Sequence, residues 1–113
     1  MKHIDLTELL EFSHLNHMKK DIIKTAGFNA VLICLEKGQE IQPHPEPYYV
    51  LFLILEGEGI ITADNAHSFC AFDPANIIAL HVKPRHMVYV ESNDIRGIKC
   101  TERMSIIGIQ QSH

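Results

Sequence analysis

From residue 27 onward, the chain is a series of short apolar runs separated by turn-forming residues. This pattern constrains the fold more than any other feature. Runs rich in β-branched and aromatic side chains are typical of strands, and Gly, Pro, Asn and Asp between them mark turns. The predicted strands cover residues 30–35, 48–55, 60–63, 66–72, 77–82, 87–91 and 104–109. Because no helical periodicity lies between them, the sequence predicts an all-β antiparallel sandwich or barrel.

The predicted strand at residues 48–55 is apolar on both faces. One face carries Tyr48, Val50, Phe52 and Ile54, and the other carries Tyr49, Leu51, Leu53 and Leu55. An antiparallel strand normally leaves one face in water, so both faces of this one need cover. Either a second sheet of the same chain or a partner subunit supplies the second cover. We therefore expect a homodimer formed through one sheet.

The first residues predict a short helix. It covers residues 5–12, where Asp5 can cap the helix, Glu8 follows three residues later, and the leucines fall on one face. We expect residues 1–24 to form an N-terminal helical arm and residues 25–113 the barrel, together one domain. His14 and His17 follow the helix in a polar connection, and we interpret them as surface histidines.

Composition excludes several function classes. Hydrophobic residues make up 46% and charged residues 21% of the chain, which is typical of globular proteins. The net charge is −4 and the ten basic residues are scattered, so a nucleic-acid partner is not expected. The apolar runs are too short to cross a bilayer and the first residues lack an apolar signal core. We therefore expect a soluble cytoplasmic protein with no membrane partner.

The three cysteines are widely spaced and form no C-x-x-C pair. Their number is odd, which does not suit a disulfide framework. We expect Cys34, Cys70 and Cys100 to be small hydrophobic residues that stay reduced.

Potential chemistry concentrates in the segment before residues 48–55. Side chains at i and i+2 of an extended chain point the same way, so His44 and Glu46 should share a side. Pro45 and Pro47 favour this extended conformation in the residues that precede them. They also lack an amide donor, so the stretch should lie at a strand edge.

A distant histidine would complete a metal-ligand set. His86 follows the turn at residues 83–85 and begins a predicted strand. With His44 and Glu46 it forms a two-histidine, one-carboxylate set, which suits divalent iron, manganese, zinc or nickel and leaves positions open for substrate.

These residues resemble the motifs of the cupin family. The first family motif is G-x5-H-x-H-x(3,4)-E-x6-G, and Gly38, His44, Glu46, Val50 and Gly57 follow its spacing. The second motif, G-x5-P-x-G-x2-H-x3-N, is matched loosely by residues 75–86. The resemblance covers residues 29–91 and implies a jelly-roll barrel of the RmlC-like kind, an antiparallel double-stranded β-helix.

The chain departs from both motifs at ligand positions. His44 and His86 align with two of the family's metal-binding histidines, whereas Glu46 replaces the middle histidine and Val50 replaces the glutamate. In the second motif the expected Gly, Pro, Gly and Asn are replaced by Ala75, His81, Lys83 and Val90.

Two interpretations of the site remain open. In the first, His44, Glu46 and His86 bind a divalent metal. In the second, the histidines line a metal-free ligand cavity with Tyr48, Val50 and Phe52. The corresponding functions are a metal-binding or metal-free small-molecule-binding cupin, with a purely structural filled barrel as a third possibility.

Whether the chain is an enzyme is left open by the sequence. It has no nucleophile elbow, phosphate-binding glycine loop or dinucleotide fingerprint. The cupin resemblance implies, for an enzyme, a metal-dependent dioxygenase or isomerase. The metal would be a Lewis acid, and Glu46 a ligand or general base.

Further polar residues near the predicted barrel are secondary candidates. His67 alternates with apolar residues and is predicted to face the pocket, and Arg85 lies at a rim where an anion could bind. His81 is expected to pack between apolar residues and bond a backbone carbonyl. Glu56 and Glu58 are expected to face solvent in a turn around Gly57.

Overall fold

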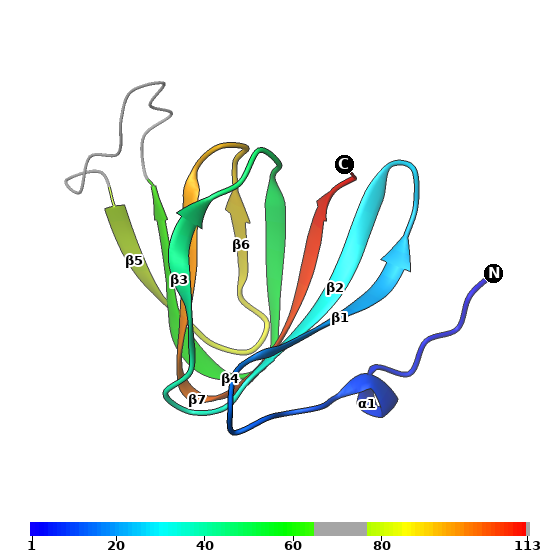
Figure 1. Ribbon diagram of the computed structural model, residues 1–113, viewed down its shortest axis with the longest axis horizontal. Coiled ribbons are helices and arrows are strands. Elements are labelled where there is room, and N and C mark those ends of the chain that lie inside the picture. The colour runs from blue at the N-terminus through cyan, green and yellow to red at the C-terminus, as the bar shows by residue number, and fades with distance from the viewer. Residues whose placement is uncertain (65–76, 113) are drawn as a thin grey trace.

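The computed structural model describes residues 1–64 and 77–112 as one short helix and seven strands, drawn in Figure 1. Predictions that fall on residues 65–76, including those for His67, Cys70, Ala75 and the strand at 66–72, lie outside the described residues. The elements are α1 (Leu6–Leu9), β1 (Met18–Lys24), β2 (Phe28–Leu35), β3 (Glu40–Pro45), β4 (Val50–Asp64), β5 (Ile77–Val82), β6 (Met87–Val90) and β7 (Ile95–Gln111).

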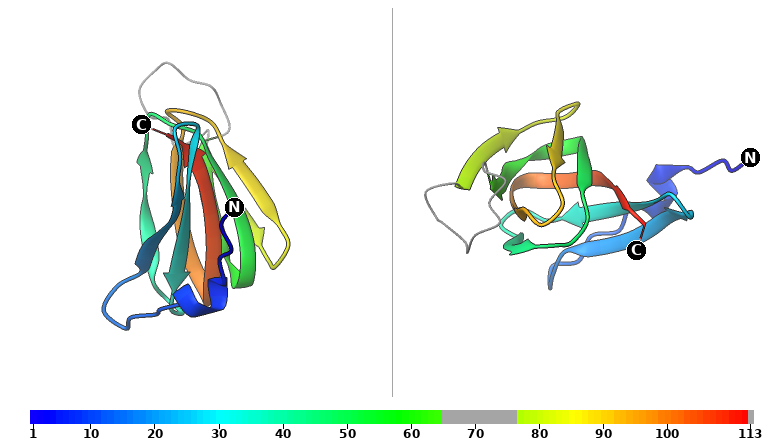
Figure 2. Two further views of the ribbon diagram at one scale, coloured as in Figure 1. Left: turned by 90° about the vertical axis from the view of Figure 1, so that its right-hand side faces the viewer. Right: turned by 90° about the horizontal axis from the view of Figure 1, so that it is seen from above.

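Two long strands are shared between two sheets. The first half of β4 pairs with β6 and with the second half of β7, which continues to β2 and β1. The second half of β4 pairs with β5 and with the first half of β7, which also pairs with β3. Every ladder is antiparallel, and the views in Figure 2 show the strands wrapped around a common interior. The predicted all-β jelly-roll fold is therefore confirmed.

The bend between the two sheets lies where the sequence predicted a turn. Residues 56–59 do not end the strand, because β4 continues through them with register shifts against β7. Gly57 adopts a φ of 83°, and a Cβ there would lie 2.0 Å from the Arg103 carbonyl oxygen. The glycine thus permits a bend with close contact of the two strands, rather than a chain reversal.

The expected boundary of the N-terminal arm is wrong. Residues 18–24 form β1, which pairs with β2 along nearly its whole length and extends the sheet. The consecutive charged residues 19–21 hide this strand in the sequence, because an edge strand tolerates polar residues. The predicted helix is present but covers only Leu6–Leu9, with the Asp5 carboxylate accepting from the Thr7 amide at 3.0 Å.

The core lies between the two sheets. Alternate residues of β2, β4 and β7 point inward and form one cluster of buried side chains, as period-two alternation requires. Its members include Val31, Ile33, Phe52, Ile98 and Ile106, each at most 5% exposed. Cys34 and Cys100 are buried free thiols, as predicted.

The outer face of the first sheet remains apolar. Leu51 and Leu53 lie opposite Tyr89 and Met87 in the β4–β6 ladder, and the latter two are 57% and 58% exposed. No element of the described chain covers Met87 and Tyr89, so homodimer formation stays a prediction. In the described residues, no helix is long and apolar enough to cross a membrane.

Candidate functional site

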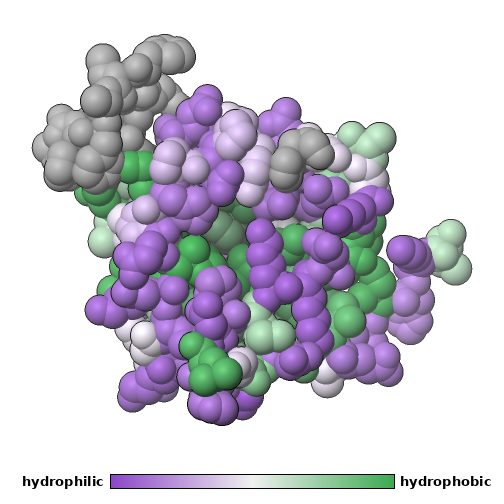
Figure 3. Space-filling view, viewed as in Figure 1, coloured by the Kyte–Doolittle hydropathy of each residue, from purple (hydrophilic) through white to green (hydrophobic). Residues whose placement is uncertain are grey.

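A cavity of about 210 Å³ lies between the two sheets. Its wall combines apolar side chains of the core with polar groups from β1, β3 and β7 and the β3–β4 connection. The lining residues are His17, Lys19, Val31, Ile33, Ile41, His44, Glu46, Tyr48, Val50, Phe52, Arg96, Gly97, Ile98 and Gln110. Figure 3 shows hydrophobic residues in the middle of the face, surrounded by hydrophilic ones. Five predicted site residues, all from positions 44–52, are thus brought together.

His44 and Glu46 form an ion-pair contact in this wall. His44 Nε2 lies 3.1 Å from Glu46 Oε1, and its other ring nitrogen, Nδ1, lies 2.8 Å from the Gln42 carbonyl oxygen. The two side chains share a side, as the alternation and the intervening Pro45 predicted. Both ring nitrogens of His44 are therefore engaged by protein oxygens.

Close contact between β3 and β7 sets the position of His44. A Cβ at Gly97 would lie 2.9 Å from the Pro43 nitrogen, so only glycine lets the two strands approach this closely. The β3–β7 register shifts between Ile41 and His44, and His44 then lies directly opposite Arg96. Residues opposite each other in an antiparallel ladder share a face, which brings the imidazole and the guanidinium to the same part of the cavity.

Arg96 is a buried cation, with only 5% of the residue exposed. Its Nη2 donates to the carbonyl oxygens of Glu91 at 2.9 Å and Asp94 at 3.2 Å, and Nε donates to Asp94 at 3.3 Å. The guanidinium carbon lies 5.5 Å from the centre of the Tyr48 ring. Within the described chain, Nη1 is buried and has no hydrogen-bond partner.

Burial has electrostatic consequences for Arg96 and Tyr48. Desolvation lowers the pKa of Arg96, against the opposing effects of Tyr48, Glu46 and Asp94. Desolvation also raises the pKa of Tyr48, and the negative charge of Glu46 raises it further. An unpaired buried donor costs about 1–3 kcal/mol of folding free energy, and more when it is charged. A group that accepts from Nη1 would remove this cost.

The interpretation of His17 as a surface residue is wrong. His17 precedes β1 and lines the cavity, and its Nδ1 is buried without a hydrogen-bond partner among residues 1–64 and 77–112. Sequence reasoning also missed Arg96 and Gln110, which both lie in β7 and are buried. Their signal was a polar residue on the inward-facing row of a strand, but the strand itself was predicted only from residue 104 onward.

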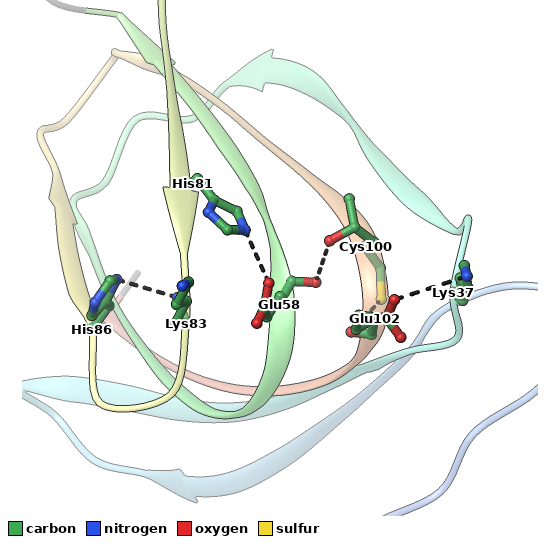
Figure 4. Close-up of polar contacts among 8 residues, drawn as sticks. Lys37, Glu58, His81, Lys83, His86, Cys100 and Glu102 are labelled. Atoms are coloured by element: carbon green, nitrogen blue, oxygen red, sulfur yellow. Dashed lines mark hydrogen bonds and ion pairs between the residues drawn. The ribbon is translucent and has the colours of Figure 1, made fainter.

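His86 lies at the other end of the barrel. Val90 pairs with Val50 near the polar end of the cavity, and His86 precedes Val90 by four residues, or about 13 Å of extended strand. Its side chain is exposed, and its Nδ1 accepts from the Lys83 amide at 3.2 Å, as Figure 4 shows. The structure therefore does not bring His86 together with His44 and Glu46.

The remaining candidates also lie outside the cavity. Arg85 is exposed in the β5–β6 turn. His81 does not pack between apolar residues as expected, because its Nε2 lies 3.2 Å from the exposed carboxylate of Glu58 (Figure 4). His81 lies opposite Ile60 in the β4–β5 ladder. His81 and Glu58 point outward from these strands.

Comparison with known proteins gives a likeness in structure alone. No protein-family model and no curated protein sequence matches this chain. An RmlC-like cupin protein from Desulfovibrio desulfuricans superposes with a TM-score of 0.79 at 16% identity, covering 98% of this chain and 96% of that one. A cupin superfamily protein from Desulfitobacterium hafniense gives 0.75 at 18% identity, covering 99% and 92%. A conserved protein with a double-stranded β-helix domain from Klebsiella pneumoniae gives 0.80 at 16%, covering 98% and 90%.

The fold is that of an RmlC-like cupin. The two glycines of the first cupin motif are consistent with this fold, since Gly38 and Gly57 adopt φ values of 90° and 83°. In the second motif, Arg85 has a φ of 73°, the left-handed conformation that suits the motif's glycine. The cupin histidine follows that glycine by three residues, which is Val88 here and not His86. Val88 packs against the core.

The residues present do not fit the cupin metal. Val50, at the position of the glutamate ligand, is 2% exposed in the core, and Val88 stands where the last histidine is expected. His44 uses both ring nitrogens on protein oxygens. Among the described residues, no group of three His, Cys, Asp or Glu side chains could hold a metal ion. We therefore derive no chemical step through a metal.

Proposed function

We propose that this cupin is a small-molecule-binding protein whose ligand occupies the cavity between the sheets without a metal. The observation that supports this most directly is the wall itself, in which apolar side chains line most of the cavity and His44, Glu46, Tyr48 and Arg96 gather at one end. Ligand sites typically combine an apolar lining with a few polar groups that fix orientation.

The buried charge argues against a barrel that is only structural. Arg96 is placed on the inner face of a strand whose neighbours on that face, Ile98 and Cys100, are apolar and buried. Replacing a buried ion by an apolar residue of similar size often stabilises a protein. A cation retained here, with one nitrogen that has no partner in the part of the chain that the structure describes, is better explained by binding than by folding stability.

The cavity size limits the ligand. A volume of about 210 Å³ is below the roughly 300–1,000 Å³ of typical sites for drug-sized ligands. We therefore expect a compact ligand.

Titration followed by amide NMR tests this function. Benzyl alcohol, benzamide and benzoate are the probes, and the shifts of Phe52, Gly97 and Ile98 report on the cavity. We expect at least one probe to give saturable shifts at these amides. If no probe binds with a dissociation constant below about 10 mM, the proposal fails.

A pair of matched variants tests the location. Val50→Phe adds volume to the cavity wall, whereas Leu51→Phe adds the same ring to the outer face of the same strand. Binding should be lost in the first and kept in the second. Equal binding by both variants would place the ligand elsewhere.

A further inference from the structure

The chemical class of the ligand can be inferred from a guanidinium nitrogen in the cavity wall, Arg96 Nη1, which is buried and has no hydrogen-bond partner among the described residues. His17 Nδ1 is also buried without a partner in that part of the chain, but it does not lie beside Arg96. Arg96 lies opposite His44 at the polar end, whereas His17 precedes Met18, which pairs with Cys34 at the other end of β2. A guanidinium nitrogen only donates hydrogen bonds, so its partner in a ligand must be an acceptor.

The charges around the cavity favour an anionic acceptor. Lys19 and Arg96 contribute cations, and the one acidic side chain in the wall, Glu46, is already in contact with His44 Nε2. The lining thus carries two cationic side chains and one acidic one, and the carboxylates of Glu46 and Asp94 also act on Arg96. Charged acceptors bind buried guanidinium donors more strongly than neutral ones do, and carboxylate geometry matches the guanidinium plane.

The remaining wall determines the rest of the ligand. Val31, Ile33, Val50, Phe52 and Ile98 offer no polar side-chain atom. An inorganic anion would leave this apolar surface in contact with water or with an empty space. A hydrocarbon body attached to the anionic group would cover it, which hydrophobic burial favours.

We propose that the cavity selects a small organic carboxylate, with its carboxylate bound by Arg96 Nη1 and its apolar body beside Phe52. This rests on the proposed binding function and specifies its ligand class. In this arrangement Tyr48 supports the guanidinium from the ring face, while the carbonyl oxygens of Glu91 and Asp94 hold its other nitrogens in place.

A comparison of benzoate with benzamide tests the class directly, because the two have nearly the same shape and differ in charge. We expect isothermal titration calorimetry to show benzoate binding at least about tenfold more tightly at neutral pH. Equal affinities would overturn the carboxylate proposal and leave the binding function standing. Failure of both probes and of benzyl alcohol would contradict the binding function itself.

Variants assign the preference to these residues. Arg96→Gln should abolish the preference for benzoate. Arg103→Gln is the matched control and should keep it, because Arg103 lies on the same strand but its exposed side chain pairs with Glu36. If Arg96→Gln does not fold, the two probes on the wild-type protein still decide. A preference that survives in folded Arg96→Gln would refute the assignment.

Discussion

The two glycines of the first cupin motif should differ sharply in their tolerance of alanine. Both have a positive φ, 90° at Gly38 and 83° at Gly57, so both substitutions carry the left-handed backbone cost of about 1–2 kcal/mol. A Cβ at Gly38 meets nothing within 4 Å. A Cβ at Gly57 would lie 2.0 Å from the Arg103 carbonyl oxygen and 2.6 Å from that of Glu102.

The magnitudes follow from these contacts. Gly38→Ala should lower the free energy of unfolding by about 1–2 kcal/mol, which is the conformational term alone. Gly57→Ala must also move β4 away from β7 at the bend, and we expect a total loss above about 4 kcal/mol. For a chain of this length, about 1 kcal/mol corresponds to roughly 4 °C in Tm.

Urea unfolding followed by circular dichroism measures both variants against the wild type. If Gly57→Ala unfolds within about 1 kcal/mol of Gly38→Ala, β4 and β7 do not approach as closely as described. That result would refute the account of the bend between the sheets.

Three further results are expected. Phe52→Ala should lower the free energy of unfolding by about 3 kcal/mol, the low end for a buried aromatic residue because the ring already borders a cavity. A loss under about 1 kcal/mol in urea unfolding would contradict its place in the core. Burial raises the pKa of Cys100, so native protein should leave this thiol unalkylated by iodoacetamide at pH 8, as peptide mass spectrometry can show. The neutral thiol is favoured in the folded state, so stability relative to Cys100→Ala should fall as pH rises above 9.0, and a rise would contradict the burial. Met87→Glu should raise the dissociation constant of a homodimer at least about tenfold in sedimentation equilibrium, because apolar contact beside Tyr89 is lost. A wild-type protein that stays monomeric would refute the dimer.

The sequence was informative wherever one face of a strand is buried. Alternation and turn residues predicted the strands at β2, β4, β5 and β6, and the Gly38 to Gly57 spacing indicated the cupin barrel. The shared side of His44 and Glu46 followed from extended geometry between two prolines. These are local properties, which a single sequence expresses directly.

Features that depend on pairing partners could not be predicted in the same way. β1 is an edge strand that tolerates three consecutive charged residues, so its sequence looked like part of an arm. The turn-like residues 56–59 form a bend inside β4, because the paired β7 supplies hydrogen bonds through it. His86 matched a motif by spacing, but the left-handed conformation of Arg85 shifts the motif by two residues and puts Val88 inside.

The polar end of the cavity depends on contacts between distant parts of the chain. Arg96 enters it through the pairing of β3 with β7. It has no neighbour in sequence that identifies it as part of a site. It stands out only by its burial and by a nitrogen that lacks a hydrogen-bond partner among the described residues.

A crystal structure of the protein soaked with benzoate tests the central claim most directly. We expect one benzoate between the sheets, with a carboxylate oxygen within hydrogen-bond distance of Arg96 Nη1 and the ring beside Phe52. Benzoate bound only outside this cavity, or a cavity closed by rearranged side chains with Arg96 Nη1 paired to a protein acceptor, would contradict it.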